Sequence, residues 1–168
     1  METVYFKGIP CHTYGNVPRP GQEAPDFSLV NRDLTDVTAA DFKDKRIVLN
    51  IFPSLDTPVC AASVRRFNQE AASVDNTVVV CVSMDLPFAQ ERFCEANNIN
   101  NVIVTSAFRS PEFAQKYGLL LTDGPLKGLL SRAVIIMDKG KVIYTDVVNE
   151  ITDEPDYESA ISVLNRPI

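Results

Sequence analysis

The sequence predicts one α/β domain built around a mixed sheet, and three observations support this prediction. Apolar runs at residues 47–52, 77–82 and 132–137 are typical of strands buried on both faces. Helical patterns separate these runs, as they do in strand–helix–strand units. A tight-turn signal at residues 138–140 then predicts an antiparallel hairpin at the end of the sheet.

The composition is that of an ordinary soluble globular protein. We expect residues 1–168 to form a single domain, since 45% of them are hydrophobic and 23% charged. With 22 acidic and 16 basic residues the net charge is −6, and no basic cluster stands out, so nucleic acid and anionic membranes are poor partners. The N-terminus lacks the features of a signal peptide, and no apolar run is long enough to cross a bilayer. We therefore expect a cytoplasmic protein.

The N-terminal part predicts short strands joined by turns. Residues 3–14 contain two short alternating pieces around a Gly-Ile-Pro turn, which is typical of a β-hairpin. Residues 17–25 are a proline-rich connection. Residues 26–30 alternate as a strand does, and residues 38–44 predict a short helical piece.

The rest of the chain alternates strands with helices. After the strand at 47–52 we expect a helix that begins near residue 58, followed by a strand at 77–82, a helix at 86–97, a strand at 102–105, a helix at 110–117, a hairpin at 132–145 and a helix at 156–164. Strand–helix–strand units require right-handed parallel crossovers, and the last hairpin adds antiparallel strands. This order is that of a thioredoxin-like fold, with a mixed central sheet flanked by helices and an N-terminal β-hairpin.

The turn between the first long strand and its helix carries the strongest chemical signal. Thr57 is a good N-cap, and Pro58 suits the first helical position because its missing N–H has no acceptor there. Cys60 then lies in the first turn, where free N–H groups and the helix dipole favour an anion. The thiolate is the nucleophilic form of cysteine. These features favour a reactive Cys60 over the alternative of an inert, buried cysteine.

The other cysteines and the single histidine limit the chemistry. No C-x-x-C pair exists, which disfavours a disulfide-exchange catalyst. His12 is the only histidine of the sequence, which rules out zinc sites with several histidines. Cys11 and Cys81 lie in predicted strands, where cysteine is usually an inert small hydrophobe. One activated thiol with a second cysteine on another helix suits a reaction with peroxide. The peroxide oxidises the activated thiol to sulfenic acid, which the second cysteine converts to a disulfide, and protein thiols can then reduce that disulfide.

Several motifs resemble one known family. Residues 53–60 spell P-S-L-D-T-P-V-C, which fits the P-x-x-x-T-x-x-C active-site signature of the peroxiredoxins. More narrowly, the chain resembles the bacterial thiol peroxidase branch, the atypical two-cysteine type, at residues 49–54, 85–94, 123–129 and 150–152. The resemblance covers nearly the whole chain.

The resemblance implies a role for five residues. Cys60 would be the peroxidatic cysteine and Cys94 the resolving cysteine of the same chain. Thr57 would hydrogen-bond the thiolate and the peroxide, and Pro53 would shield the thiolate from water. Arg132 would stabilise the thiolate and the developing charge. From the residues alone, Arg132 would be interpreted as a surface arginine at a strand edge. For Cys94 the alternative is a buried helical cysteine that never meets Cys60.

The resemblance also implies the activity: thiol-dependent reduction of hydrogen peroxide and of organic or lipid hydroperoxides for antioxidant defence. Thioredoxin would be the reductant, a homodimer the assembly, and no metal, haem or flavin would be needed. The apolar residues 119–130 and Phe88 either line an entrance for bulky peroxides or pack as ordinary core. Two rival functions are a protein thiol–disulfide oxidoreductase and a redox-sensing or chaperone-like module that uses a Cys60–Cys94 disulfide as a switch.

A disulfide between Cys60 and Cys94 requires movement of the chain. The two Cα atoms of a disulfide lie within about 7 Å of each other, whereas these two cysteines are expected on separate helices. We therefore expect both helices to unfold locally in each catalytic cycle.

Overall fold

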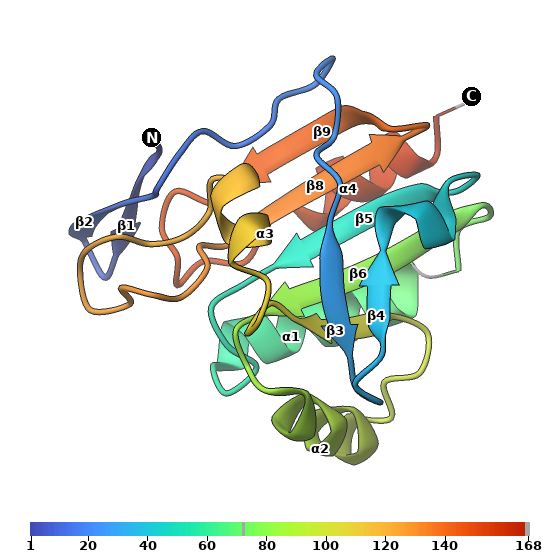
Figure 1. The fold of residues 1–168 in the computed structure, drawn as a ribbon, viewed down its shortest axis with the longest axis horizontal. Coiled ribbons are helices and arrows are strands. Elements are labelled where there is room, and N and C mark those ends of the chain that lie inside the picture. The colour runs from blue at the N-terminus through green and yellow to red at the C-terminus, as the bar shows by residue number, and fades with distance from the viewer. Residues whose placement is uncertain (72, 167–168) are drawn as a thin grey trace.

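The structure is a computed structural model that describes residues 1–71 and 73–166. Its elements are β1 (Thr3–Phe6), β2 (Ile9–His12), β3 (Ser28–Asn31), β4 (Asp36–Thr38), the 3₁₀ turn η1 (Ala39–Phe42), β5 (Arg46–Ile51), α1 (Pro58–Glu70), β6 (Thr77–Ser83), α2 (Pro87–Asn97), β7 (Ile103–Ser106), α3 (Pro111–Lys116), β8 (Ala133–Asp138), β9 (Lys141–Val147) and α4 (Tyr157–Leu164). The main sheet has the order β4-β3-β7-β6-β5-β8-β9, and β1 pairs with β2 in a separate hairpin (Figure 1). The predicted mixed sheet and N-terminal hairpin are confirmed.

The centre of the sheet fixes where the chemistry lies. β5 runs parallel to β6 and antiparallel to β8, and β6 runs parallel to β7. All six residues of β5 are buried, which agrees with its unbroken apolar run. Because the carboxyl ends of β5 and β6 meet at one edge of the sheet, the segments that lead into α1 and α2 leave the sheet side by side.

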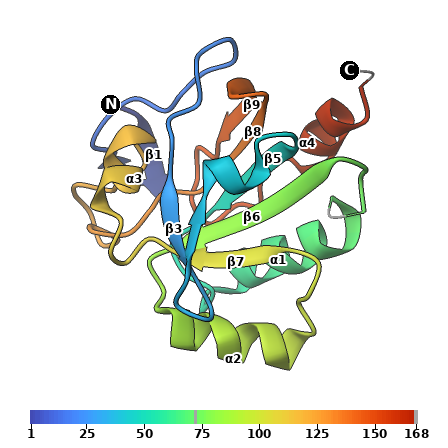
Figure 2. The same ribbon diagram turned by 45° about the vertical axis from the view of Figure 1, so that its right-hand side comes forward.

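Helices cover both faces of the sheet. On one face, Val48 of β5 belongs to a buried cluster that includes Phe67 of α1 and Tyr157 of α4. On the other face, Leu49 belongs to a second cluster with Phe113 of α3. Helix α3 therefore lies on the opposite side of the sheet from α1 and α4 (Figures 1 and 2). The alternation of Val48 and Leu49 between the two clusters explains why a strand covered on both sides needs a continuous apolar sequence.

The N-terminal hairpin packs on two distant segments. The Tyr5 N–H donates to the Asn149 carbonyl at 2.7 Å, and the Ile151 N–H donates to the Tyr5 carbonyl at 2.8 Å. The Cys11 side chain is fully buried beside Gly124, where an added Cβ would lie 2.6 Å from the Cys11 Sγ. Gly124 has a φ of +78°, so both the close approach and the backbone conformation require glycine.

The structure differs from the sequence-based expectations at the sheet edge. The short strand β4 was not predicted, and it exists because its three residues pair antiparallel with β3. The predicted helical piece at 38–44 is the shorter 3₁₀ turn η1, and α3 ends at Lys116. None of the helices formed by residues 1–71 and 73–166 is long and apolar enough to cross a membrane.

Candidate active site

Cys60 lies in the first turn of α1, as the sequence predicts. Thr57 has extended backbone angles and is the N-cap residue, and Pro58 begins the helix. Cys60 is fully buried and begins a stripe of buried residues that continues with Ser63, Val64 and Phe67, so the helix packs this face on the sheet. Pro58 has no N–H, and the Ala61 N–H donates to the Thr57 carbonyl at 3.0 Å, so the first-turn N–H groups without an acceptor in the helix are those of Val59 and Cys60.

A buried arginine contacts this thiol. The Arg132 Nη2 lies 3.2 Å from the Cys60 Sγ, and its Nε donates to the Ile151 carbonyl at 2.8 Å. Arg132 is only 2% exposed, so the interpretation as a surface arginine is wrong. Its Nη1 has no hydrogen-bond partner among the described residues. The guanidinium is thus held by two contacts, while one N–H-bearing nitrogen is left for a further acceptor.

The N-terminal hairpin supports the carbonyl that orients Arg132. The Glu150 carboxylate accepts hydrogen bonds from the N–H of Lys7 at 3.1 Å, of Gly8 at 2.9 Å and of Thr152 at 3.2 Å. These bonds, led by that of Gly8, lower the pKa of Glu150 to about 2. The next residue is held by the same hairpin, since the Ile151 N–H donates to the Tyr5 carbonyl at 2.8 Å while the Ile151 carbonyl accepts from Arg132. Sequence reasoning missed this role of Glu150, because the partners lie 142 and 143 positions away.

The loop between β5 and α1 is tied to the end of β6. The Ser54 hydroxyl donates to the Asp85 Oδ1 at 2.7 Å, and the Leu55 N–H donates to Oδ2 at 2.8 Å. Pro53 is buried in the same loop, and the Thr57 hydroxyl donates to the Ser54 carbonyl at 3.0 Å. Sequence reasoning did not single out Asp85. The sequence feature that could identify Asp85 is its position two residues after the buried strand β6, which runs parallel to β5.

Cys94 is the second cysteine of the expected pair. It lies on α2, is buried, and carries a free thiol, as do the other three cysteines. Burial raises the pKa of Cys94, and the positive charge of Arg32 opposes that shift. Cys60 and Cys94 belong to the same buried cluster, and the structure has no disulfide between them.

Comparison with known proteins shows the family. The model of the Redoxin family matches residues 19–161. The chain belongs to the Redoxin family. A thiol peroxidase from Corynebacterium glutamicum is 51% identical to this redoxin over 166 residues, which cover 98% of this chain and all of that protein. The chain is accordingly a peroxiredoxin-type peroxidase, an oxidoreductase that reduces peroxides with a thiol.

Solved structures agree on the fold. A peroxiredoxin-like protein from Aquifex aeolicus has a TM-score of 0.92 at 44% identity, over 98% of this chain and 96% of that one. A thiol peroxidase from Chromobacterium violaceum has a TM-score of 0.88 at 23% identity, over 96% of this chain and 94% of that one. The thioredoxin-like redoxin fold predicted from the order of elements is therefore confirmed.

The other residues that the sequence analysis singles out differ in burial. Cys81 is fully buried, and this burial raises its pKa to about 12, so its thiol is neutral at physiological pH. Leu119, Leu121 and Leu130 of the 119–130 loop are also buried and pack as core, whereas Leu120, Leu126 and Leu129 are half-buried. Phe88, in contrast, is 63% exposed on α2.

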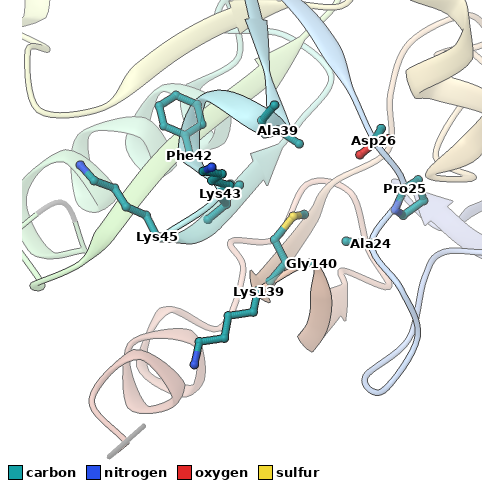
Figure 3. Close-up of a pocket in the computed structure, with 12 residues that line it drawn as sticks. Ala24, Pro25, Asp26, Ala39, Phe42, Lys43, Lys45, Lys139 and Gly140 are labelled. Atoms are coloured by element: carbon teal, nitrogen blue, oxygen red, sulfur yellow. The ribbon is translucent and has the colours of Figure 1, made fainter.

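A cavity of about 410 Å³ lies away from this site. It is lined by residues 24–26, by η1, by the turn at Lys139 and Gly140, and by residues that include Ile47 (Figure 3). Ile47 lies near the start of β5, whereas Cys60 follows the end of that strand, so the cavity opens at the opposite end of the sheet. Within residues 1–71 and 73–166, no cluster of three or more His, Cys, Asp or Glu side chains is suited to a metal ion.

Proposed function

We propose that this redoxin reduces hydrogen peroxide and organic or lipid hydroperoxides through a sulfenic acid on Cys60, an intrachain disulfide with Cys94, and recycling by thioredoxin, as part of antioxidant defence. The observation that carries the proposal is the contact between the Arg132 guanidinium and the Cys60 thiol at 3.2 Å. A fixed positive charge and a helix N-terminus together stabilise negative charge on a buried sulfur.

The first step is attack of the Cys60 thiolate on the terminal oxygen of the peroxide. A sulfur–oxygen bond forms and the O–O bond breaks, which leaves sulfenic acid on Cys60 and an alkoxide or hydroxide that takes up a proton to become an alcohol or water. The Arg132 Nη1 has no partner among the described residues and can donate to the oxygen on which charge develops. In this proposal the Thr57 hydroxyl leaves the Ser54 carbonyl to bind the thiolate and the peroxide, and Pro53 excludes water.

The second and third steps restore the thiol. The Cys94 sulfur displaces the sulfenic oxygen as water, which forms the Cys60–Cys94 disulfide, and a dithiol reductant then reduces this disulfide by exchange. Burial raises the pKa of Cys94, so its thiol stays protonated and unreactive until α2 opens. This order of events is consistent with local unfolding after the first oxidation.

The compartment and the assembly are part of the same proposal. Free thiols and a thioredoxin reductant are maintained in a reducing compartment, which favours the cytoplasm. The resemblance to thiol peroxidases favours a homodimer, and sedimentation equilibrium of the reduced protein tests this assembly.

A coupled peroxidase assay with cysteine variants tests the proposed cycle. Cys60→Ser should abolish peroxide consumption. Cys94→Ser should keep the first oxidation but lose thioredoxin-linked turnover, with mass spectrometry finding sulfenic or sulfinic acid on residue 60. Cys81→Ser is the matched control, because it removes a buried thiol outside the cycle.

Each alternative predicts a different result in this assay. Full thioredoxin-linked turnover by Cys94→Ser would move the resolving role to Cys11 or Cys81. A single stoichiometric oxidation of the wild-type protein, without turnover, would indicate a redox sensor instead. Running the assay with hydrogen peroxide and with cumene hydroperoxide shows whether bulky peroxides are substrates.

A further inference from the structure

We infer that Asp85 is a positioning residue that fastens the Cys60 loop and the Cys94 helix to the same point of the sheet, so that both are released together when the disulfide forms. The inference deepens the proposed function and rests on it, because it concerns the step that joins Cys60 to Cys94.

The Asp85 carboxylate uses both oxygens on the loop that leads to Cys60. Oδ1 accepts from the Ser54 hydroxyl at 2.7 Å, and Oδ2 accepts from the Leu55 backbone N–H at 2.8 Å. Hydrogen bonds to an ionised carboxylate are about twice as strong as those between neutral groups. The Leu55 side chain is buried, so this carboxylate holds a loop that also packs into the core.

The same carboxylate is linked to the Cys94 helix through Ser83. The Ser83 hydroxyl donates to the Asp85 Oδ2 at 2.7 Å and accepts from the Gln90 Nε2 at 3.2 Å. Gln90 is fully buried on α2 and also donates to the Thr105 carbonyl at 2.7 Å. Since Gln90 lies four residues before Cys94, it holds the turn of α2 directly below the resolving cysteine. We refer to Asp85, Ser83 and Gln90, with the hydrogen bonds that they make to each other, to residues 54–55 and to Thr105, as the Asp85 network.

The Asp85 network opposes disulfide formation and favours the peroxide step. Cys60 and Cys94 lie on separate helices, and the proposed disulfide requires the Cys60 loop, α2 or both to move away from the sheet, which would break the bonds that Asp85 and Gln90 make there. In the reduced chain the network keeps the Cys60 loop in the arrangement that faces Arg132, and alignment of this kind is what the peroxide step needs. Loss of Asp85 should therefore slow the first step and speed the second.

Two rates measured on the same variants test this inference. For Asp85→Ala we expect the second-order rate constant for Cys60 oxidation to fall about tenfold, and the rate of Cys60–Cys94 disulfide formation to rise about tenfold. Competition with a reporter peroxidase gives the first rate, and quenched flow with alkylation and mass spectrometry gives the second. Asp85→Asn keeps one acceptor oxygen for the Leu55 N–H, so it should give smaller changes in the same directions.

Controls separate positioning from charge and from general destabilisation. Asp56→Asn removes a charge from the same loop, and its exposed carboxylate has no hydrogen bond or ion pair among the described residues, so both rates should remain within about twofold of wild type. Ser54→Ala removes one bond to Asp85, and it serves with Asp85→Asn if Asp85→Ala does not fold. Cys81→Ala lowers the general stability through a small cavity without removing a bond of Asp85, Ser83 or Gln90, so it is the control for destabilisation, and both of its rates should remain within about twofold of wild type.

The outcomes distinguish this inference from the proposed function. Opposite changes in the two rates, graded from Asp85→Asn to Asp85→Ala, support the inference. Wild-type rates in both Asp85 variants, or parallel changes, overturn it while the proposed function stands. If the wild-type protein forms no Cys60–Cys94 disulfide with peroxide, the proposed function fails, and the coupling assigned to Asp85 fails with it.

Discussion

Arg132 and Cys60 are 72 positions apart in the chain, yet the Arg132 Nη2 lies 3.2 Å from the Cys60 Sγ. Both side chains are buried, at 2% and 0% exposure. A buried guanidinium costs free energy unless an opposite charge or an acceptor pairs with it. In the proposed cycle a thiolate on Cys60 would supply that charge, and the 3.2 Å contact places the two groups where they would stabilise each other.

Replacing Arg132 with lysine should therefore impair the peroxide step. An ammonium group has three donors on a single nitrogen instead of a planar fork, so it cannot place them where the Arg132 Nε, Nη2 and Nη1 lie at the same time. We expect Arg132→Lys to lower the second-order rate constant with hydrogen peroxide by about 100-fold, the usual effect of removing one donor to a developing charge. Competition kinetics measure this rate. Arg109→Lys, at an exposed position, is the control.

A small effect would contradict this role of Arg132. If Arg132→Lys and the control Arg109→Lys both retain more than about a third of the wild-type rate constant, a positive charge at position 132 is sufficient. The planar geometry of the guanidinium then does not matter.

Glu150 should make the stability of the hairpin region depend on pH. Its folded-state pKa is about 2, below the usual 4.5, chiefly because the Gly8 N–H donates to its carboxylate. A depressed pKa means that Glu150 stabilises the fold fully above about pH 4.5, and that this contribution is lost as the pH falls toward 2. Glu150→Gln should therefore be less stable than wild type at pH 7, with the difference shrinking below pH 4.5. Urea midpoints from pH 7 to pH 2.5 measure this difference.

An exposed carboxylate elsewhere is the control for Glu150. Glu95→Gln removes a carboxylate from the exposed side of α2 that makes no hydrogen bond or ion pair among the described residues. Its urea midpoint should follow that of wild type at each pH. A difference between Glu150→Gln and wild type that stays constant from pH 7 to pH 2.5 would refute the assigned linkage.

The local part of the site was predictable from the sequence. The unbroken apolar run of β5, the N-cap position of Thr57 and the proline at position 58 together place Cys60 in the first turn of α1. These signals act over a few neighbouring residues, because backbone conformation and helix ends depend on local sterics and hydrogen bonds. For the same reason the hairpin at 138–140 was predicted from its turn residues alone.

The contacts that complete the site were not predictable in this way. Arg132 contacts Cys60 across 72 positions, Glu150 contacts Gly8 across 142, and Asp85 contacts Ser54 across 31. Such contacts depend on the register of strands that the sequence does not specify locally. The family resemblance indicates Arg132, whereas the contacts of Glu150 and Asp85 follow only from the three-dimensional structure.

Cys81 should be dispensable for activity. Its pKa of about 12, raised by burial, keeps the thiol neutral, and it is fully buried in β6. We expect Cys81→Ala to keep the peroxidase rate within about twofold of wild type and to lose about 1–2 kcal/mol of unfolding free energy from the small cavity. Iodoacetamide at pH 8 should leave Cys81 unlabelled in the native protein. Labelling of Cys81 before denaturation, or loss of turnover in Cys81→Ala, would show that this thiol takes part in the cycle.

Hydrogen exchange should reveal the movement that joins Cys60 to Cys94. In the reduced form both cysteines are buried within ordered helices, so amides of α1 and α2 should be protected. Formation of the disulfide should lower protection at least tenfold at residues 57–65 and 86–97, while residues 77–83 of β6 stay protected as an internal reference. Mass spectrometry of the reduced and the oxidised protein measures this. Cys94→Ser treated with peroxide should keep the protection of the reduced form, since it oxidises without a disulfide. Identical protection in reduced and oxidised wild-type protein at both segments would mean that the disulfide forms without unfolding either helix.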